Sequence, residues 1–390
     1  MERIKYIDQV EIKNKRVLMR VDFNVSFDKE GKIKSDERIK KSLQSIKYLL
    51  NQGNQLILIS HLGRPKGRDM SFSMKPVGER LQQYLPDYKI VLVDDFLKSF
   101  PQTKKGKIFL LENTRFYAGE KKNDPEFSQK LAKLADVFVS DAFGSVHRAH
   151  ASVVGVANYL PSYGGLLLKK EVEMIKKVIN NPVHPVVAII AGAKISTKTG
   201  IIERLMRIAD YVLIGGAMTN TFWQAQELII GKSLSEPEFV NEAKKLMEQA
   251  KKDHRQLIIP EDGFVGNPED EKTVGIARNK TEIKENDNVL DIGPQTIKKY
   301  QEIISQAKTI IWNGPVGYFE NFQYRKGTDA IYGAVVANSQ AISVVGGGDI
   351  LTAIKDKRQN DKITHISTGG GAMLELIEKG TLPGIEVLKG

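Results

Sequence analysis

Short runs of β-branched and apolar residues alternate with amphipathic helical patterns along the whole chain. This alternation is typical of parallel sheets covered by helices on both faces, and therefore predicts an α/β fold. The clearest helical pattern covers 36–51, where apolar residues recur every three or four positions and Gly53 follows the last turn. Strands are predicted at 16–21, 55–60, 89–93, 107–111 and 136–140, and then at 186–190, 211–214, 256–259, 309–312 and two runs that end in glycine.

A chain of 390 residues exceeds the size at which single hydrophobic cores usually stop growing, so two domains are expected. A helical pattern at 166–179, ended by Asn181-Pro182, separates two halves of similar organisation. We therefore place the domain boundary between 170 and 185.

The two halves differ in charge. Residues 1–180 hold 33 Lys and Arg against 21 Asp and Glu, a net charge of +12, whereas residues 181–390 hold 25 against 26, a net charge of −1. A basic half beside a neutral one indicates a domain that collects anions. Nucleic acid is the rival ligand, but the chain has no long Lys/Arg block and no basic stripe rich in aromatic residues. We expect small anions and no nucleic acid.

Composition also bears on the compartment. The chain has no cysteine, which excludes disulfides and thiolate metal sites and fits a reducing compartment. The segment 1–8 lacks the apolar run of a signal peptide, and no uncharged stretch approaches the length of a membrane span. We expect a cytoplasmic protein without membrane contact.

Two strands near the C-terminus run into three consecutive glycines and then into a helical pattern, at 341–354 and 365–377. Glycine lets the backbone turn tightly and approach a ligand closely. A helix that starts there directs unpaired N–H groups and a positive dipole end outward, which suits a phosphate. Tight turns of an ordinary α/β fold are an equally good explanation of the glycines alone.

In open α/β sheets, ligands bind beyond the carboxyl ends of the strands. In the first half these positions carry polar tips with arginines, at Asp22-Phe23-Asn24, His61-Leu62-Gly63-Arg64, Glu112–Arg115 and Asp141–Arg148. Guanidinium groups match carboxylate and phosphate oxygens bidentately, although any one arginine could instead form a surface ion pair. A cage for a small, doubly anionic molecule would be made by His61 with Arg38, Arg64, Arg115 and Arg148.

The corresponding positions in the second half offer glycine amides and lysines. Lys194 and Lys198 stand at i and i+4, which predicts one face of a helix start, either beside a phosphoryl group or simply solvated. Asp349 follows the first triple glycine and suits a magnesium ion on nucleotide phosphates, or a plain helix N-terminus. Glu320 could accept hydrogen bonds from ribose hydroxyls.

Common nucleotide motifs are missing. The chain has no G-x-x-x-x-G-K-[ST], and neither triple glycine completes G-x-G-x-x-G, because Leu351 and Leu374 occupy the last position. This removes most support for a nicotinamide dehydrogenase, which stays an alternative together with a nucleic-acid-binding protein.

Taken together, several passages resemble the phosphoglycerate kinase family, in the family's order and over essentially the whole chain. They are Arg20-Val-Asp-Phe-Asn-Val, Ser60-His-Leu-Gly-Arg-Pro, Glu112-Asn-Thr-Arg-Phe, Asp141-Ala-Phe-Gly-Ser-Val-His-Arg, Gly192-Ala-Lys-Ile-Ser-Thr-Lys, Asn313-Gly-Pro-Val-Gly-Tyr-Phe-Glu, Val345-Gly-Gly-Gly-Asp and Ser367-Thr-Gly-Gly-Gly-Ala. The resemblance implies two Rossmann-like three-layer αβα domains joined by a helix, with a cleft between them. The expected parts are a triose-binding domain (1–170), a linking helix (171–184), a nucleotide-binding domain (185–372) and a tail that returns to the first domain (373–390).

The resemblance also implies an activity. It is reversible, magnesium-dependent phosphoryl transfer from 1,3-bisphosphoglycerate to ADP, giving 3-phosphoglycerate and ATP in glycolysis, by a monomeric enzyme that closes its domains. Arg38 and Lys198 match the residues that stabilise the transferring group. The triose set is Asp22, Phe23, Asn24, Arg38, His61, Leu62, Gly63, Arg64, Arg115 and Arg148; the nucleotide set is Lys194, Lys198, Glu320, Gly347, Gly348, Asp349 and Ile350, with Asp349 as the magnesium ligand.

Three positions depart from the family pattern. Ile350 replaces the usual Thr or Ser, so only its backbone amide is expected to reach a phosphate. Ser140 stands where Asn is usual, and Ala191 where Gly is common. We expect a modest effect of the first on nucleotide affinity and local effects of the others.

Overall fold

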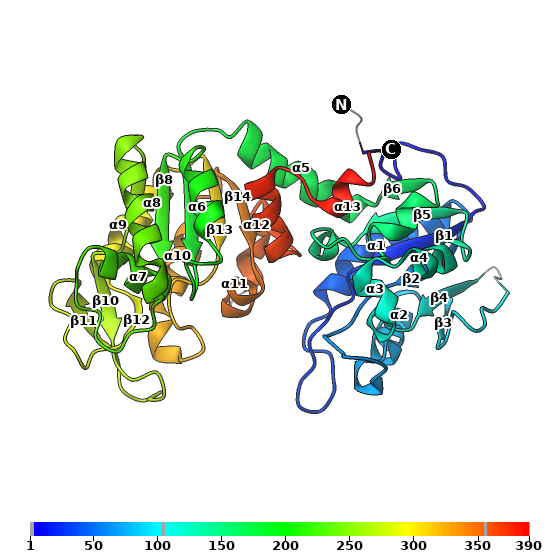
Figure 1. Cartoon of the computed structure of the whole chain (residues 1–390), viewed down its shortest axis with the longest axis horizontal. Coiled ribbons are helices and arrows are strands. Elements are labelled where there is room, and N and C mark those ends of the chain that lie inside the picture. The colour runs from blue at the N-terminus through cyan, green and yellow to red at the C-terminus, as the bar shows by residue number, and fades with distance from the viewer. Residues whose placement is uncertain (1–3, 103–105, 355–356, 390) are drawn as a thin grey trace. The chain divides into compact units, whose positions relative to one another are not determined.

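The computed structural model describes residues 4–102, 106–354 and 357–389. The chain forms two compact units; in Figure 1 the first is blue to green with a red C-terminal segment, and the second runs from green to red. The first unit holds the residues up to Glu173 together with those from Lys379 onward, and the second holds Met174–Glu378.

A six-stranded sheet with the order β3-β4-β2-β1-β5-β6 forms the centre of the first unit, and all its neighbouring strands are parallel. Its strands are β1 (Arg16–Val21), β2 (Gln55–Ile59), β3 (Lys89–Val93), β4 (Lys107–Leu111), β5 (Val137–Asp141) and β6 (Ser162–Gly164). Its helices are α1 (Glu37–Asn51), α2 (Lys75–Tyr84), α3 (Ala118–Lys122) and α4 (Pro125–Ala132). The parallel α/β prediction is confirmed here; the short strand β6 was not predicted.

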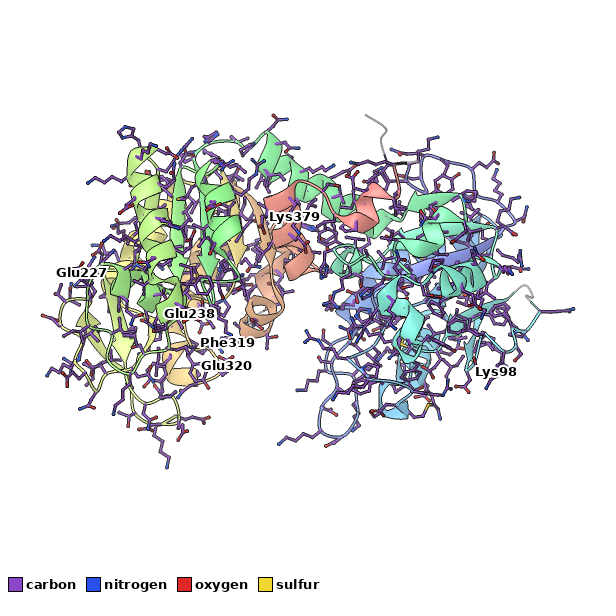
Figure 2. All side chains as sticks on the ribbon, in the orientation of Figure 1. Lys98, Glu227, Glu238, Phe319, Glu320 and Lys379 are labelled. Atoms are coloured by element: carbon purple, nitrogen blue, oxygen red, sulfur yellow. The ribbon has the colours of Figure 1, made fainter. Side chains whose placement is uncertain are left out.

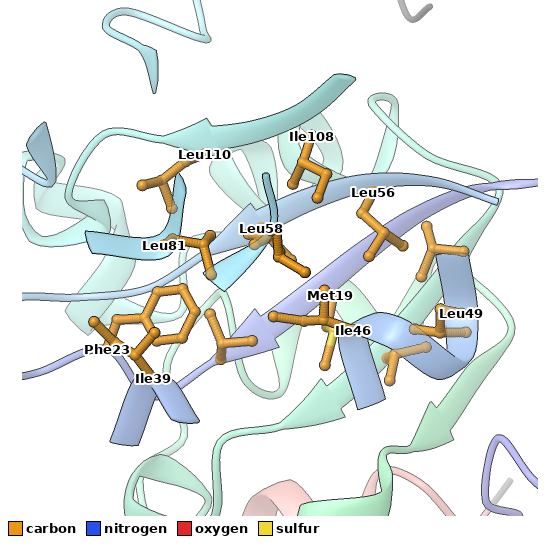
Figure 3. Close-up of a cluster of buried hydrophobic side chains, with 14 of the residues drawn as sticks. Met19, Phe23, Ile39, Ile46, Leu49, Leu56, Leu58, Leu81, Ile108 and Leu110 are labelled. Atoms are coloured by element: carbon orange, nitrogen blue, oxygen red, sulfur yellow. The ribbon is translucent and has the colours of Figure 1, made fainter. Parts of the chain in front are cut away.

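Both faces of this sheet are buried. Met19 of β1 packs with Ile39 and Ile46 of α1 in one apolar cluster, part of which is shown in Figure 3. The neighbouring residue Leu18 points the other way and joins a second cluster that includes Phe138. Since successive side chains of a strand alternate between faces, a strand buried on both reads as a continuous apolar run. This layering fixes where the strands end, and so where the site residues begin.

The second unit contains a parallel six-stranded sheet with the order β15-β14-β13-β7-β8-β9. Its strands are β7 (Val186–Ala191), β8 (Tyr211–Gly215), β9 (Gln256–Ile258), β13 (Thr309–Asn313), β14 (Ile342–Gly346) and β15 (His365–Ser367). The longer helices of the unit are α6 (Thr199–Met206), α7 (Met218–Ala225), α8 (Val240–Lys252), α9 (Pro294–Gln306), α10 (Lys326–Ala337) and α12 (Gly370–Lys379). A short helix α11 (Gly348–Ala353) follows β14.

A three-stranded antiparallel sheet in the second unit was not predicted. It has the order β11-β10-β12 and consists of β10 (Asp262–Val265), β11 (Ile276–Asn279) and β12 (Val289–Ile292). Each of these strands has four residues and carries a charged or amide side chain, so none gives the apolar run that marks the central strands. The small sheet is relevant to function because β12 borders the cavity described below.

Helix α5 (Leu166–Asn180) contains the division between the two units, and the chain from Lys379 returns to the first unit. There α13 (Pro383–Glu386) packs on the segment after β5, where the Gly384 amide donates to the Val146 carbonyl at 2.8 Å. Leu382, Ile385 and Leu388 are buried. Within the described residues, no helix is long and apolar enough to span a bilayer.

Candidate active site

Asp22 follows β1, and Arg38 lies in the first turn of α1. The Arg38 guanidinium donates from Nη1 to Oδ2 of Asp22 at 2.7 Å. The Asp22 side chain is 4% exposed, whereas that of Arg38 is 34% exposed. The buried carboxylate thus holds one edge of a guanidinium that can still meet a ligand.

Three predicted site segments of the first unit meet at Gly63. Its amide donates to Asn24 Oδ1 at 2.8 Å, and its carbonyl accepts a hydrogen bond from Arg115 Nη1. Gly63 has φ +60°, and a Cβ here would lie 2.2 Å from the Phe72 ring, so the position requires glycine. Phe23 and Leu62 are buried and contribute to the core beneath this loop.

His61 is buried, and its Nδ1 lies 2.9 Å from Nη2 of Arg20. A guanidinium can only donate, so Nδ1 accepts and the ring proton is on Nε2. Burial, followed by the positive charges of Arg20, Arg115, Arg148 and Arg38, lowers the pKa of His61 well below its usual value. His61 therefore offers a neutral N–H at neutral pH rather than a positive charge.

Arg20 was not among the predicted site residues, although it contacts His61. It lies fully buried within β1, where Nε donates to Ser152 Oγ at 3.0 Å. Ser152 Oγ in turn donates to Oε1 of the buried Glu120 at 2.6 Å. The signal was an arginine inside an apolar strand, because a buried cation needs partners.

The remaining arginines form a concentration of positive charge. Burial, followed by the positive charges of Arg148 and Arg20, lowers the pKa of Arg115 to about 10. Nε of Arg115 has no hydrogen-bond partner among the described residues. Arg148 is half-buried with Nε 3.1 Å from Nε2 of His147, and Arg64 is exposed. A bound anion would relieve this mutual repulsion, which is the behaviour expected of an anion site.

In the second unit, Lys198 approaches the carboxyl ends of the central strands. Nζ donates to Oδ1 of Asn313 at the end of β13, and Nδ2 of Asn313 donates to the carbonyl of Gly346 at the end of β14. Burial lowers the pKa of Lys198 to about 8, and the negative charge of Asp349 opposes this shift. A half-buried lysine is thus held between two strand ends.

The prediction that Lys194 and Lys198 share one face of a helix start is wrong. Helix α6 begins at Thr199, so Lys198 caps the helix and Lys194 lies exposed in the preceding turn. Two features keep this turn out of the helix. Gly192 has φ +140°, and Ser196 donates from its amide and its hydroxyl to Glu236 at 2.9 and 2.6 Å.

The two triple-glycine turns touch each other. Gly347 has φ +132°, and a Cβ on Gly370 would lie 2.3 Å from Gly347 Cα. The predicted helix starts are confirmed, because α11 begins at Gly348 and α12 at Gly370. Asp349 is exposed in the first turn of α11, whereas the Ile350 side chain is fully buried in the apolar core. Ile350 can therefore offer a ligand only its backbone.

A cavity of about 600 Å³ lies within the second unit, beside these turns. Its walls are largely apolar, and Glu320 and Asp349 border it. Other lining residues are Gly192, Ala193, Gly216, Ala217, Trp223, Leu234, Leu290, Asp291, Val316 and Phe319. Figure 2 shows Phe319 and Glu320 next to each other on the loop that follows β13. An apolar cavity whose border includes the backbone of Gly192 and Gly216 and the side chain of Asp349 suits a nucleotide, with its base inside and its phosphates at the rim.

Comparison with known proteins decides the family. The family model described as Phosphoglycerate kinase matches residues 7–380. The chain belongs to the phosphoglycerate kinase family. A phosphoglycerate kinase from Dictyoglomus turgidum is 45% identical over 383 residues, which cover 97% of this chain and 96% of the relative. One from Koribacter versatilis is 45% identical over 395 residues, which cover 98% of each protein.

Solved structures agree. Phosphoglycerate kinase from Coxiella burnetii superposes with a TM-score of 0.89 at 38% identity, and covers 99% of this chain and 98% of its own. That from Pyrococcus horikoshii OT3 gives a TM-score of 0.85 at 30% identity with the same coverage. The α/β fold is thus that of phosphoglycerate kinases, and the chain is a kinase. The dehydrogenase and nucleic-acid alternatives are set aside.

Phosphoglycerate kinases use a nucleotide, and Asp349 is the residue predicted to hold a nucleotide-bound magnesium ion. Among the described residues, no three His, Asp or Glu side chains gather to form a metal cage. Magnesium is commonly held by one or two carboxylates together with substrate phosphates. The exposed carboxylate of Asp349, at the glycine turn and the rim of the cavity, fits that arrangement.

Proposed function

We propose that this chain catalyses reversible phosphoryl transfer between 1,3-bisphosphoglycerate and ADP, giving 3-phosphoglycerate and ATP, with Mg²⁺ bound to the nucleotide. The observation that carries the proposal is the presence of two complementary sites on one chain. The first unit has an arginine cluster around Gly63, and the second has an apolar cavity bordered by glycine turns. Family membership supports the same reading.

In this proposal the first unit binds the phosphoglycerate. Its carboxylate and phosphate are anions, which the guanidinium groups would bind bidentately. Asn24 and Asp22 would receive the hydroxyl, and the neutral His61 would donate from Nε2. The anion-binding arginines are Arg38, Arg64, Arg115 and Arg148.

The second unit would bind the nucleotide. The base would enter the apolar cavity, and Glu320 at its border would accept from the ribose hydroxyls. The phosphates would meet the amides of Gly347–Ile350 and the ammonium groups of Lys194 and Lys198. Asp349 would hold the magnesium ion, which neutralises charge on the phosphates when bound.

The reaction needs no general base, because the attacking ADP oxygen and the leaving carboxylate are already anions. Catalysis then consists of alignment and charge stabilisation. Arg38 and Lys198 would stabilise the transferring group, and losing one such contact costs on the order of 2.7–4 kcal/mol of barrier. Since the two residues belong to different units, we propose that transfer requires the units to close on each other and exclude water.

The decisive experiment is a coupled assay with ATP, Mg²⁺ and 3-phosphoglycerate. We expect ADP production that depends on all three components. Turnover of a nicotinamide cofactor without ADP would contradict the proposal. So would a protein that ignores 3-phosphoglycerate and binds nucleic acid with a steep salt dependence. We further propose a cytoplasmic location and a monomeric state. Sedimentation at working concentrations would test the monomeric state.

A further inference from the structure

The loop that follows β13 carries Val316, Phe319 and Glu320 into the border of the cavity. Backbone groups hold the loop in place. The Val316 amide donates to Thr328 Oγ1 at 3.1 Å, and the Tyr318 amide donates to the Leu290 carbonyl at 2.7 Å. The position of Glu320 is therefore set by contacts made two and four residues earlier in the chain.

Asp291, at the end of β12, lies beneath this loop. It is 3% exposed, and each carboxylate oxygen accepts a backbone hydrogen bond. Oδ1 accepts from the Ile292 amide at 2.9 Å, and Oδ2 accepts from the Gly327 amide at 2.7 Å. Gly327 precedes Thr328 in the first turn of α10, so the carboxylate also fixes the residue that binds Val316.

The loop rests directly on the same carboxylate. A Cβ on Gly317 would lie 2.1 Å from Asp291 Oδ1, so the backbone at Gly317 is in contact with it. Burial raises the pKa of Asp291 to about 8, with Asp329 adding to the shift and the two amide donors and Lys326 opposing it. Burying a carboxyl group costs free energy of folding, which indicates that the position of this side chain matters. The phosphoryl transfer proposed above does not use it.

We propose that Asp291 and Thr328 are positioning residues that hold the loop 314–320 and thereby set the affinity of this chain for nucleotide. The inference rests on the proposed function, because it assumes that ADP occupies the cavity. Neither residue needs to touch the phosphates. Both act through the backbone that presents Val316 and Glu320.

The first test uses Thr328. Thr328→Val has nearly the same shape but cannot accept from the Val316 amide, so we expect the Kd for ADP to rise roughly 5- to 10-fold. The Kd for 3-phosphoglycerate should not change. Thr328→Ser keeps the hydroxyl and should restore ADP binding to within about twofold of the natural chain. Binding would be measured by calorimetry on the full chain.

Thr309→Val is the matched control. Thr309 is fully buried at the start of β13, and its Oγ1 accepts from the Val183 amide at 3.1 Å and donates to the Val183 carbonyl at 2.8 Å. The variant loses these two hydrogen bonds at the start of β13, the end of that strand away from the loop 314–320. We expect it to lower the Tm but to leave the Kd for ADP unchanged.

Asp291→Asn provides an independent test. An amide can accept only through its one oxygen, so its NH₂ would oppose one of the two backbone N–H groups. We expect weaker ADP binding and unchanged 3-phosphoglycerate binding. The inference is overturned if Thr328→Val binds ADP like the natural chain, or if Thr309→Val weakens ADP binding equally. If the natural chain binds ADP nowhere and does not phosphorylate 3-phosphoglycerate, the proposed function fails as well.

Discussion

Arg38 and Asp22 form an asymmetric pair, in which the guanidinium donates across 2.7 Å to a carboxylate that is almost fully buried. A surface pair with both partners exposed contributes little to stability or orientation. Here the rigid carboxylate fixes the direction of a partly exposed arginine at the start of α1. The pair therefore holds the exposed part of Arg38 in a defined direction, where we propose that a ligand binds.

Arg38→Ala should lower kcat at least about a hundredfold, because it removes a charge that stabilises the transferring group. The Kd for ADP should stay close to that of the natural chain. Arg16→Ala is the matched control, since Arg16 pairs with Asp136 at 2.7 Å with both side chains well exposed. Steady-state kinetics and calorimetry would test both variants. If Arg38→Ala loses ADP affinity as strongly as it loses turnover, the assignment of Arg38 to the phosphoglycerate site is contradicted.

His61 should remain neutral across the working pH range. Its pKa is lowered by burial and by the surrounding arginines. As the pH rises from acid values, the imidazolium therefore loses its second ring proton well below pH 6.5. We expect NMR signals of the ring to show no titration between about pH 6 and 8, with Nε2 as the protonated nitrogen. His61→Gln would assign the signals. A midpoint near 6.5 would contradict this environment.

Lys198 should make nucleotide binding depend on pH. Its pKa of about 8 means that the free protein loses this positive charge as the pH rises through 8. Bound phosphate stabilises the charged form, so the Kd for ADP should increase about tenfold between pH 7 and 9. Lys198→Arg keeps its charge and should flatten that dependence.

Lys198→Ala should weaken ADP binding and reduce turnover while sparing 3-phosphoglycerate. Its ammonium lies within the second unit, where it donates to Asn313 and interacts electrostatically with Asp349. Titration of each substrate separately would measure the two affinities. A weakened 3-phosphoglycerate site with intact ADP binding would reverse the assignment.

The contact between the two triple-glycine turns offers a test with adjacent positions. Gly370→Ala would place a methyl group 2.3 Å from Gly347 Cα, so we expect the turns to separate and the Kd for ADP to rise at least about tenfold. Gly371→Ala meets nothing within 4 Å and is the control. Similar ADP affinities of the two variants would show that the close approach does not matter for binding.

The strongest strands and helices could be predicted closely from the sequence. The bounds of β1, β3 and β4 match the apolar runs, and α1 begins one residue after the predicted start. Burial on both faces gives such strands an uninterrupted apolar signal. The strands of the antiparallel sheet lack that signal, and they are defined by pairing with one another rather than by their own composition.

The expectation that ligands bind beyond the carboxyl ends of strands identified the segments around Asp22, Gly63 and Arg115. The structure brings these segments together through Gly63. It could not find the Arg20–Ser152–Glu120 chain of hydrogen bonds, because these residues come from a strand interior, a loop and a short helix. The spacing of Lys194 and Lys198 predicted a shared helix face, and this prediction is wrong. The hydrogen bonds from Ser196 to Glu236 that hold the turn are tertiary contacts, which the spacing does not reveal. The catalytic roles of the site residues stay predictions.

The return of the chain from Lys379 to the first unit bears on the order of synthesis. Leu382, Ile385 and Leu388 are buried there, and Gly384 packs against Val146 and Val153. A ribosome makes these residues only after the entire second unit. A nascent first unit therefore keeps an uncovered apolar surface at Val146 and Val153 while the second unit is being made, and it completes its core only when the chain beyond Lys379 emerges.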